Sequence, residues 1–304
     1  MLMLWRKLSP RLWQYYDKMD KQKILMNSAV ALLIFIPIWF ILFIPGLKSL
    51  PDNFNYKATI FSTDNFYDAE KRDFGGEFAS NTRFSYEVVD VKNGILIVKN
   101  TFEVRKFTGE KIFSVERSYG IIKKTGQHVK GFGDRDREGY LFAPKKLKRG
   151  EGFTYWHINY DEPAHMEFKD VEKIEGLEVY RYETNYHADQ TSDLEHLPGV
   201  PEERGINLDI NLQLWIEPVT GRMIKYEDKT IAYYYDTKTE ERIHPWNKFN
   251  NKFNPLSVKN QVEIAKGIKF KISLVEKIIP VLIGLIAILL LIIRYMKFSK
   301  KEKR

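Results

Sequence analysis

Histidine is the residue type in this chain with the widest chemical range, and six are present: His128, His157, His165, His187, His196 and His244. Imidazole nitrogens bind copper and zinc, so His157, His165 and His187 could form a metal site if the fold brings them together. No pair has the spacing of a known metal motif, and the alternative is that they are surface or hydrogen-bonded histidines. We assign no metal and no cofactor.

A second candidate is the segment of alternating charge at residues 134–138, which reads Asp-Arg-Asp-Arg-Glu beside Gly131, Gly133 and Gly139. Carboxylate oxygens at short spacing suit a hard cation such as Ca²⁺, and the same loop could contact a partner. It lacks the full spacing of an EF-hand loop. The alternative is a solvated turn whose charges pair with one another.

Aromatic side chains are concentrated between residues 155 and 235. Where they alternate along a strand they share one face, which could line a cavity for a lipid, a glycan or another hydrophobic ligand. The alternative is that this stripe is the core of a sheet. Our candidate ligand-binding residues are Tyr155, Trp156, Tyr180, Tyr182 and Trp215.

Motifs for catalysis are absent from the sequence. It has no Gly-x-Ser-x-Gly, no His-Glu-x-x-His and no phosphate-binding loop, and Gly131-Phe-Gly133 lacks the third dinucleotide-loop glycine. The chain has no cysteine, which excludes thiolate metal sites, cysteine nucleophiles and disulfides. We therefore expect a protein that is not an enzyme and has no catalytic residues.

Two long apolar runs, Ile24–Ile44 and Ile278–Ile293, flank the middle of the chain. About 20 apolar residues in a helix span the hydrocarbon layer, which predicts transmembrane helices at residues 24–45 and 278–296. The first run is longer than a signal-peptide core, and no small-x-small cleavage site follows it. It therefore favours an uncleaved signal anchor over a cleaved signal peptide.

The charged tails predict the orientation in the membrane. Residues 1–23 hold six Lys and Arg against two Asp, and residues 294–304 hold six against one Glu, so the tails account for the chain's net charge of +8. Short positive flanks stay cytoplasmic, which predicts a plasma-membrane protein with both termini (residues 1–23 and 297–304) inside and the middle domain outside. Residues 1–23 have an amphipathic pattern, typical of a helix in the headgroup layer or of a flexible tail with aromatic anchors. The expected partners include membrane lipids but no nucleic acid, because the folded part keeps no basic patch.

The middle segment, residues 46–256, has the pattern of a β-rich domain. Apolar and polar residues alternate from Phe84 to Tyr235, and Asn93-Gly94 is a tight-hairpin signal. We expect ten to twelve short strands between Asn53 and Tyr235. After them, Ser257 is a plausible cap for a juxtamembrane helix at residues 257–277, which leads into the second membrane helix with a break or bend at Gly267 and Pro280.

An internal repeat is suggested by two matching stretches, at about residues 84–130 and 166–225. The segment around Gly94 resembles that around Gly176, and Thr125-Gly126 resembles Thr220-Gly221. The second copy is longer, and we assign the excess to a polar loop between His187 and Gly205. Two generic hairpins could give the same pattern by chance. The fold class we predict is a mainly β extracytoplasmic domain, a duplicated β-meander forming a sandwich or half-barrel, held by N- and C-terminal transmembrane α-helices.

Several short motifs resemble a prokaryotic family of two-pass membrane proteins, the porin PorA family. The motifs are Gly139-Tyr-Leu-Phe-Ala-Pro144, Phe153-Thr-Tyr-Trp156, Ile174-Glu-Gly-Leu-Glu-Val-Tyr180 and Trp215-Ile-Glu-Pro-Val-Thr-Gly221, together with the apolar pattern of Ala265–Tyr295. The resemblance covers most of Tyr56–Tyr295. It implies fold and topology and carries no chemistry to particular residues.

The physics of porin strands limits what that resemblance implies. Such strands alternate apolar-out and polar-in and close a barrel inside the bilayer, whereas here two apolar helices cross it. We therefore expect a non-enzymatic cell-surface protein whose external β domain binds or scaffolds an envelope component, a protein, glycan or lipid. The first alternative is a carrier of a lipid or hydrophobic ligand in a cavity of that domain. The second is a subunit of an oligomeric pore, and a homo-oligomer is a possible state.

Overall fold

The computed structural model describes residues 21–47, 49–191 and 203–302, and the chain divides into two compact units. One unit is Ser49–Lys269, and the other comprises Met1–Lys48 with Phe270–Arg304. The expected tail at residues 1–23 falls almost wholly outside the described residues.

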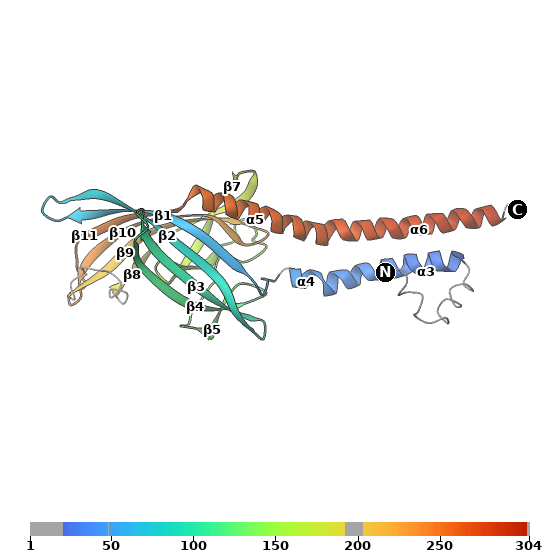
Figure 1. Ribbon diagram of the computed structural model, residues 1–304, viewed down its shortest axis with the longest axis horizontal. Helices are drawn as coiled ribbons and strands as arrows, with labels where there is room; N and C mark the ends of the chain where they lie inside the picture. Colours follow the sequence, from blue (N-terminus) through green and yellow to red (C-terminus); the bar gives the residue numbers. More distant parts are fainter. Residues whose placement is uncertain (1–20, 48, 192–202, 303–304) are drawn as a thin grey trace. The chain divides into compact units, whose positions relative to one another are not determined.

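Eleven strands form one antiparallel sheet in the first unit (Figure 1). Ten of them fall at residues 55–236, where ten to twelve were expected, and the eleventh, Arg242–Phe253, lies beyond the expected range. Their order is β5-β4-β3-β2-β1-β11-β10-β9-β8-β7-β6, so each half of the domain is a meander and the first and last strands pair in the middle. The strands are β1 (Asn55–Asp68), β2 (Asp73–Lys92), β3 (Ile95–Lys106), β4 (Lys111–Ile122), β5 (His128–Gly133), β6 (Phe153–His157), β7 (Glu162–Ile174), β8 (Leu177–Asp189), β9 (Arg204–Glu217), β10 (Arg222–Asp236) and β11 (Arg242–Phe253).

The two edges of this sheet are joined by Tyr140, in the segment between β5 and β6. Tyr140 pairs with Gln127 on one side and with Tyr155 of β6 on the other. The preceding Gly139 has φ +70°, and a Cβ there would lie 2.5 Å from the carbonyl oxygen of Thr154, so this close approach requires glycine. The domain is therefore a curled single sheet, which corresponds to the expected half-barrel and not to the expected sandwich.

Large aromatic side chains pack the interior of the curled sheet. Tyr56 of β1 stacks on Phe84 of β2 with ring centroids 5.8 Å apart, and Phe142 lies 4.5 Å from Tyr56. Such offset and edge contacts add to the burial of the rings. The tyrosines that are almost completely buried are Tyr56, Tyr86, Tyr119, Tyr155, Tyr182 and Tyr226.

The two stretches matched in the sequence share turn geometry. Asn93-Gly94 and Glu175-Gly176 both have two consecutive positive φ angles, the pattern of a type I′ hairpin. In the other pair, Thr125 and Thr220 each accept a bond from the backbone N–H two residues later, at 3.3 and 3.2 Å. Duplication itself stays a prediction. The expected loop at His187–Gly205 is shorter, because β8 continues to Asp189 and β9 begins at Arg204, and residues 192–202 lie outside the described residues.

Helix α5 (Pro255–Ser273) covers the opposite face of the sheet. Its Val262 and Ala265 pack on a second apolar cluster formed by Leu177, Val179, Trp215 and Ile224. The expected cap at Ser257 is wrong. Asn254 caps the helix by accepting from the Ser257 N–H at 2.7 Å, with Pro255 in the first turn, where a missing N–H is harmless. The Ser257 hydroxyl instead accepts from the Thr59 N–H of β1 at 2.8 Å.

The second unit is an antiparallel pair of apolar helices, α3 (Lys21–Leu42), followed by α4 (Ile44–Leu47), and α6 (Ile279–Glu302). Lys23–Gly46 and Pro255–Met296 are helices long and apolar enough to cross a membrane. The expected break at Gly267 is absent, since α5, a π-helical turn at Leu274–Ile278 and α6 follow one another directly.

The π-helical turn explains how Pro280 fits into a continuous helix. The Ile279 N–H bonds to the Leu274 carbonyl five residues back. In this register Pro280, which has no N–H, falls opposite the carbonyl of Val275. The Trp39 indole N–H of α3 donates to that carbonyl at 3.1 Å, which replaces the missing backbone bond.

Candidate functional site

A cavity of about 210 Å³ lies on the inner face of the curled sheet, beyond the tyrosine-packed part. The cavity exists because small polar residues occupy inward positions there and do not fill the interior. In the β1–β2 pairing, Ile60 faces Thr82 and Ser62 faces Ser80, whereas further along the same two strands Ala58 faces Phe84 and Tyr56 faces Tyr86. Both serines and Thr82 are buried. The interior therefore changes from packed aromatic to open and polar along β1 and β2.

Aromatic rings form the opposite walls of the cavity. Trp246 and Phe249 of β11 meet edge to face with centroids 6.2 Å apart, and Phe102 of β3 stacks on Phe113 of β4 at 6.1 Å. A few polar groups among aromatic walls are typical of a small-molecule site.

Asp64 of β1 is the one acidic residue that lines this cavity among the described residues. Burial raises the pKa of Asp64 from 3.8 to about 6, and a bond from the Asn247 amide at 3.1 Å opposes part of that rise.

The floor of the cavity is a buried polar cluster centred on Asp228 of β10, which is fully buried. Three residues that line the cavity, Asn159, Tyr160 and Asn251, also donate to the Asp228 carboxylate, at 2.9, 3.4 and 3.1 Å respectively. The hydroxyls of Tyr226 and Thr230 donate to it at 2.5 and 2.9 Å. Every one of these donors is neutral.

His157 of β6 extends this cluster into the tyrosine core. Its Nε2 lies 2.6 Å from the Tyr226 hydroxyl, and its Nδ1 meets the Tyr186 hydroxyl. Since Tyr226 donates to Asp228, its oxygen accepts from Nε2–H, and Nδ1 accepts from Tyr186. Burial lowers the pKa of His157 to about 4 against the opposing effect of Asp228, so the imidazole is neutral at pH 7.

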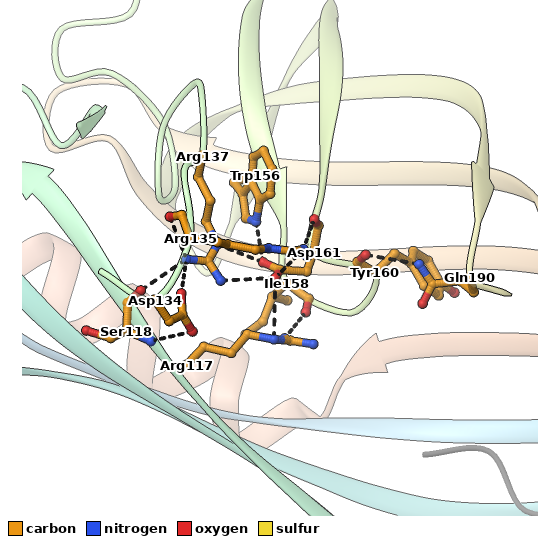
Figure 2. A network of polar contacts seen from close by, with 10 residues as sticks. All are labelled: Arg117, Ser118, Asp134, Arg135, Arg137, Trp156, Ile158, Tyr160, Asp161 and Gln190. Atoms are coloured by element: carbon orange, nitrogen blue, oxygen red, sulfur yellow. Dashed lines mark hydrogen bonds and ion pairs between the residues drawn. The ribbon is translucent and has the colours of Figure 1, made fainter. Parts of the chain in front are cut away.

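One tight turn, between β6 and β7, supplies residues to two neighbouring sites. Asp161 has φ +52°, a conformation that Asp tolerates better than most residues, and its N–H bonds to the His157 carbonyl at 2.7 Å. This turn directs Asn159 and Tyr160 to the cavity floor. It directs Asp161 into a network of arginines (Figure 2).

The arginine network borders a second recess, of about 360 Å³, which shares Phe102, Phe113, Asn159 and Gln190 with the cavity. Arg137 forms a two-pronged ion pair with Asp161 at 2.9 and 3.0 Å and bonds Asp134 at 2.5 Å. Arg117 and Arg135 also pair with Asp161. Burial alone would raise the pKa of Asp161, but the Arg137 bond and the charge of Arg117 hold it below its usual value.

The segment 134–138 agrees with the solvated-turn alternative in part: its other four residues are exposed and Asp134 pairs with Arg137, but Arg137 itself points into the fold. Arg137 is buried and its guanidinium lies 4.2 Å from the centre of the Tyr119 ring. The described residues contain no group of three or more His, Cys, Asp or Glu placed to hold a metal ion.

The structure does not bring the five candidate ligand residues together, and none lines the cavity. Tyr155 and Tyr182 are core residues, and Trp156 donates to Asp161 at 2.5 Å. Tyr180 packs edge-on against Phe168, partly exposed. Trp215 lies on the other face of the sheet, under α5.

The three histidines considered for a metal are also apart. His157 is inside the sheet, His165 is exposed, and His187 bonds Asp209 at 2.6 Å on the outer side. His187 and Asp209 border a further recess, of about 620 Å³, across β8–β11. Arg242 also pairs with Asp209, and Lys229 and Lys248 line the same recess.

The residues that form the cavity and its floor were missed by the sequence reasoning. A signal for the floor is present in β10, where period-two alternation places Asp228 on the same face as Tyr226 and Ala232. A carboxylate in the apolar half of such a pattern indicates a buried polar group that needs partners. Asp64 gives no such signal, because polar residues surround it in sequence.

Comparison with known proteins identifies a family and a weakly similar solved structure. Residues 24–296 match the model of a protein family described as Porin PorA. A solved structure from Bacteroides fragilis NCTC 9343, described as having a YmcC-like fold, is similar over 67% of this chain and 96% of its own, with 12% identity and a TM-score of 0.29. No curated protein matches this sequence.

Proposed function

This chain belongs to the Porin PorA family, and we propose that it is a membrane-anchored binding protein whose β domain holds a small ligand inside the curled sheet. The observation that carries the proposal is the set of small polar residues, Ser62, Ser80 and Thr82, at inward positions of an otherwise packed interior. With the adjoining recess, the space is in the range of small-molecule sites, about 300–1,000 Å³.

Binding fits the polar floor better than catalysis does. His157 and Asp228 are the residues best suited to move protons, but both are fully buried. The Asp228 oxygens are engaged by neutral donors, and both nitrogens of His157 are engaged by tyrosines. Carriage of a whole lipid is disfavoured, because an acyl chain in this cavity would leave the buried hydroxyls of Ser62, Ser80 and Thr82 without partners.

Pore formation is the second candidate, and the family description favours it. The interior of the sheet is filled by the buried tyrosines, which argues against a water channel through one copy. An oligomeric pore would conduct ions when the purified protein is added to planar bilayers, and absence of conductance would exclude it.

The binding proposal is tested by native mass spectrometry of the full chain in detergent. We expect a copurified small molecule in the wild type and its loss in Ser80→Leu, which fills the cavity. Ser85→Leu, on the other face of β2, is the matched control and should keep the ligand. A ligand retained in Ser80→Leu, or no bound molecule in the wild type, would contradict the proposal.

The orientation is also part of the proposal. The basic tails favour cytoplasmic termini and an extracytoplasmic β domain. External protease added to intact cells should then cleave the domain, and full protection would show the opposite orientation.

A further inference from the structure

Two carboxyl groups inside the curled sheet have no cationic partner among the described residues. Asp64 contacts the Asn247 amide, and Asp228 contacts only neutral donors and the neutral His157 at 3.7 Å. The neighbouring Asp161, by contrast, is paired with three arginines. Asp228 is fully buried and Asp64 is partly buried. Carboxylates removed from water are normally paired with cations or metals, so the interior has a deficit of positive charge.

The walls beside Asp64 suit a particular kind of cation. Trp246, Phe249, Phe102 and Phe113 present aromatic rings around the cavity. The negative face of an aromatic ring attracts an organic ammonium group, most strongly where water is excluded. The amide oxygen of Asn159, which is buried without a hydrogen-bond partner, adds an acceptor at the floor.

We propose that the ligand of this cavity is a small organic cation, whose ammonium group lies between Asp64 and the aromatic rings of Trp246 and Phe249. This inference rests on the proposed binding function and names its ligand class. The cavity of about 210 Å³ has room for one ammonium group with a few carbons. The group could belong to a free cation or to the headgroup of a lipid.

The test compares choline with 3,3-dimethyl-1-butanol, a neutral molecule of the same shape, by calorimetric titration of the full chain in a detergent without an ammonium group. We expect saturable binding of choline and at least tenfold weaker binding of the alcohol. Asp64→Asn should weaken choline binding at least tenfold, Trp246→Leu should weaken it several-fold, and the exposed control Asp90→Asn should leave it unchanged. Absence of saturable choline binding, or equal binding of the two probes, would overturn the assignment.

A pH profile gives an independent readout, since choline does not titrate. Of the described side chains that line the cavity, Asp64 and Tyr160 are the titratable ones; the nearest arginines, Arg117, Arg135 and Arg137, border the adjoining recess. Choline binding should therefore weaken as the pH falls through the region in which Asp64 is protonated. Binding that is unchanged there would contradict the role of Asp64.

Two outcomes separate this inference from the function on which it rests. A copurified ligand without an ammonium group would refute the cation and leave the binding function intact, whereas an interior that binds nothing would refute both. Competition by phosphatidylcholine vesicles, with phosphatidylglycerol vesicles as control, would assign the ammonium group to a lipid headgroup. Lack of competition would assign it to a free cation.

Discussion

Replacement of Asp64 by Asn tests the electrostatics of the cavity directly. Burial raises the pKa of this carboxyl from 3.8 to about 6, so ionisation at neutral pH opposes folding. At about 1.4 kcal/mol per pKa unit, the shift corresponds to at most about 3 kcal/mol. Asp64 is partly exposed, so solvent screens part of this effect, and we expect Asp64→Asn to stabilise the ligand-free protein by about 2 kcal/mol at pH 8.

The sign of this effect depends on pH in a defined way. Because the folded-state pKa is above the unfolded-state value, the destabilising contribution of Asp64 is absent below about pH 4 and grows as the pH rises to about 6. The stabilisation by Asp64→Asn should therefore be near zero at low pH and reach its plateau above pH 6. Urea unfolding of both proteins across this range measures it. A variant that is less stable than the wild type at pH 8, or a difference independent of pH, would refute the reasoning.

Three further changes test other parts of the structure. Asp161→Asn should destabilise the domain by about 3 kcal/mol in urea unfolding, because the buried Arg137 guanidinium loses its two-pronged partner and keeps only the more exposed Asp134; a loss below 1 kcal/mol would contradict this. Gly139→Ala should cost about 2–3 kcal/mol, since φ is +70° and the new Cβ meets a carbonyl, whereas Gly131→Ala, at φ +77° in open space, should cost about 1 kcal/mol; equal losses would argue against the edge junction. Trp39→Phe should weaken the helix pair by about 1 kcal/mol in SDS titrations, and Phe40→Leu, which is exposed, should change it little.

Local patterns predicted the elements of this fold well. Asn93-Gly94 specifies a tight hairpin because both residues tolerate positive φ, and the two apolar runs exceed the length of a membrane crossing. The cap of α5 was also within reach, because Asn254-Pro255 is a common start of a helix.

The arrangement of those elements was not predictable from local patterns. Ser62 and Asp64 have the composition of a solvated strand end, and only the distant pairings of β1 with β2 and β11 bury Ser62 and partly bury Asp64. In the same way, Arg137 belongs to a run of charges in sequence, and its burial depends on Asp161, 24 residues away. The sheet-core alternative for the aromatic stripe holds for Tyr155 and Tyr182. The cavity, however, occurs where β1 and β2 carry small inward residues in place of large ones.

The pairing of β1 with β11 has a consequence for how the protein is synthesised. Ile60 meets Phe253, so the central ladder cannot form until nearly the whole domain has left the ribosome. Until then the inner edges of both meanders, β1 and β10, expose unpaired backbone groups that can join strands of other chains. The strand that completes the sheet ends two residues before Pro255, where the helix toward the second membrane span begins. Completion of the domain and insertion of that span are therefore nearly simultaneous steps, and a nascent chain held before β11 is the form most exposed to aggregation.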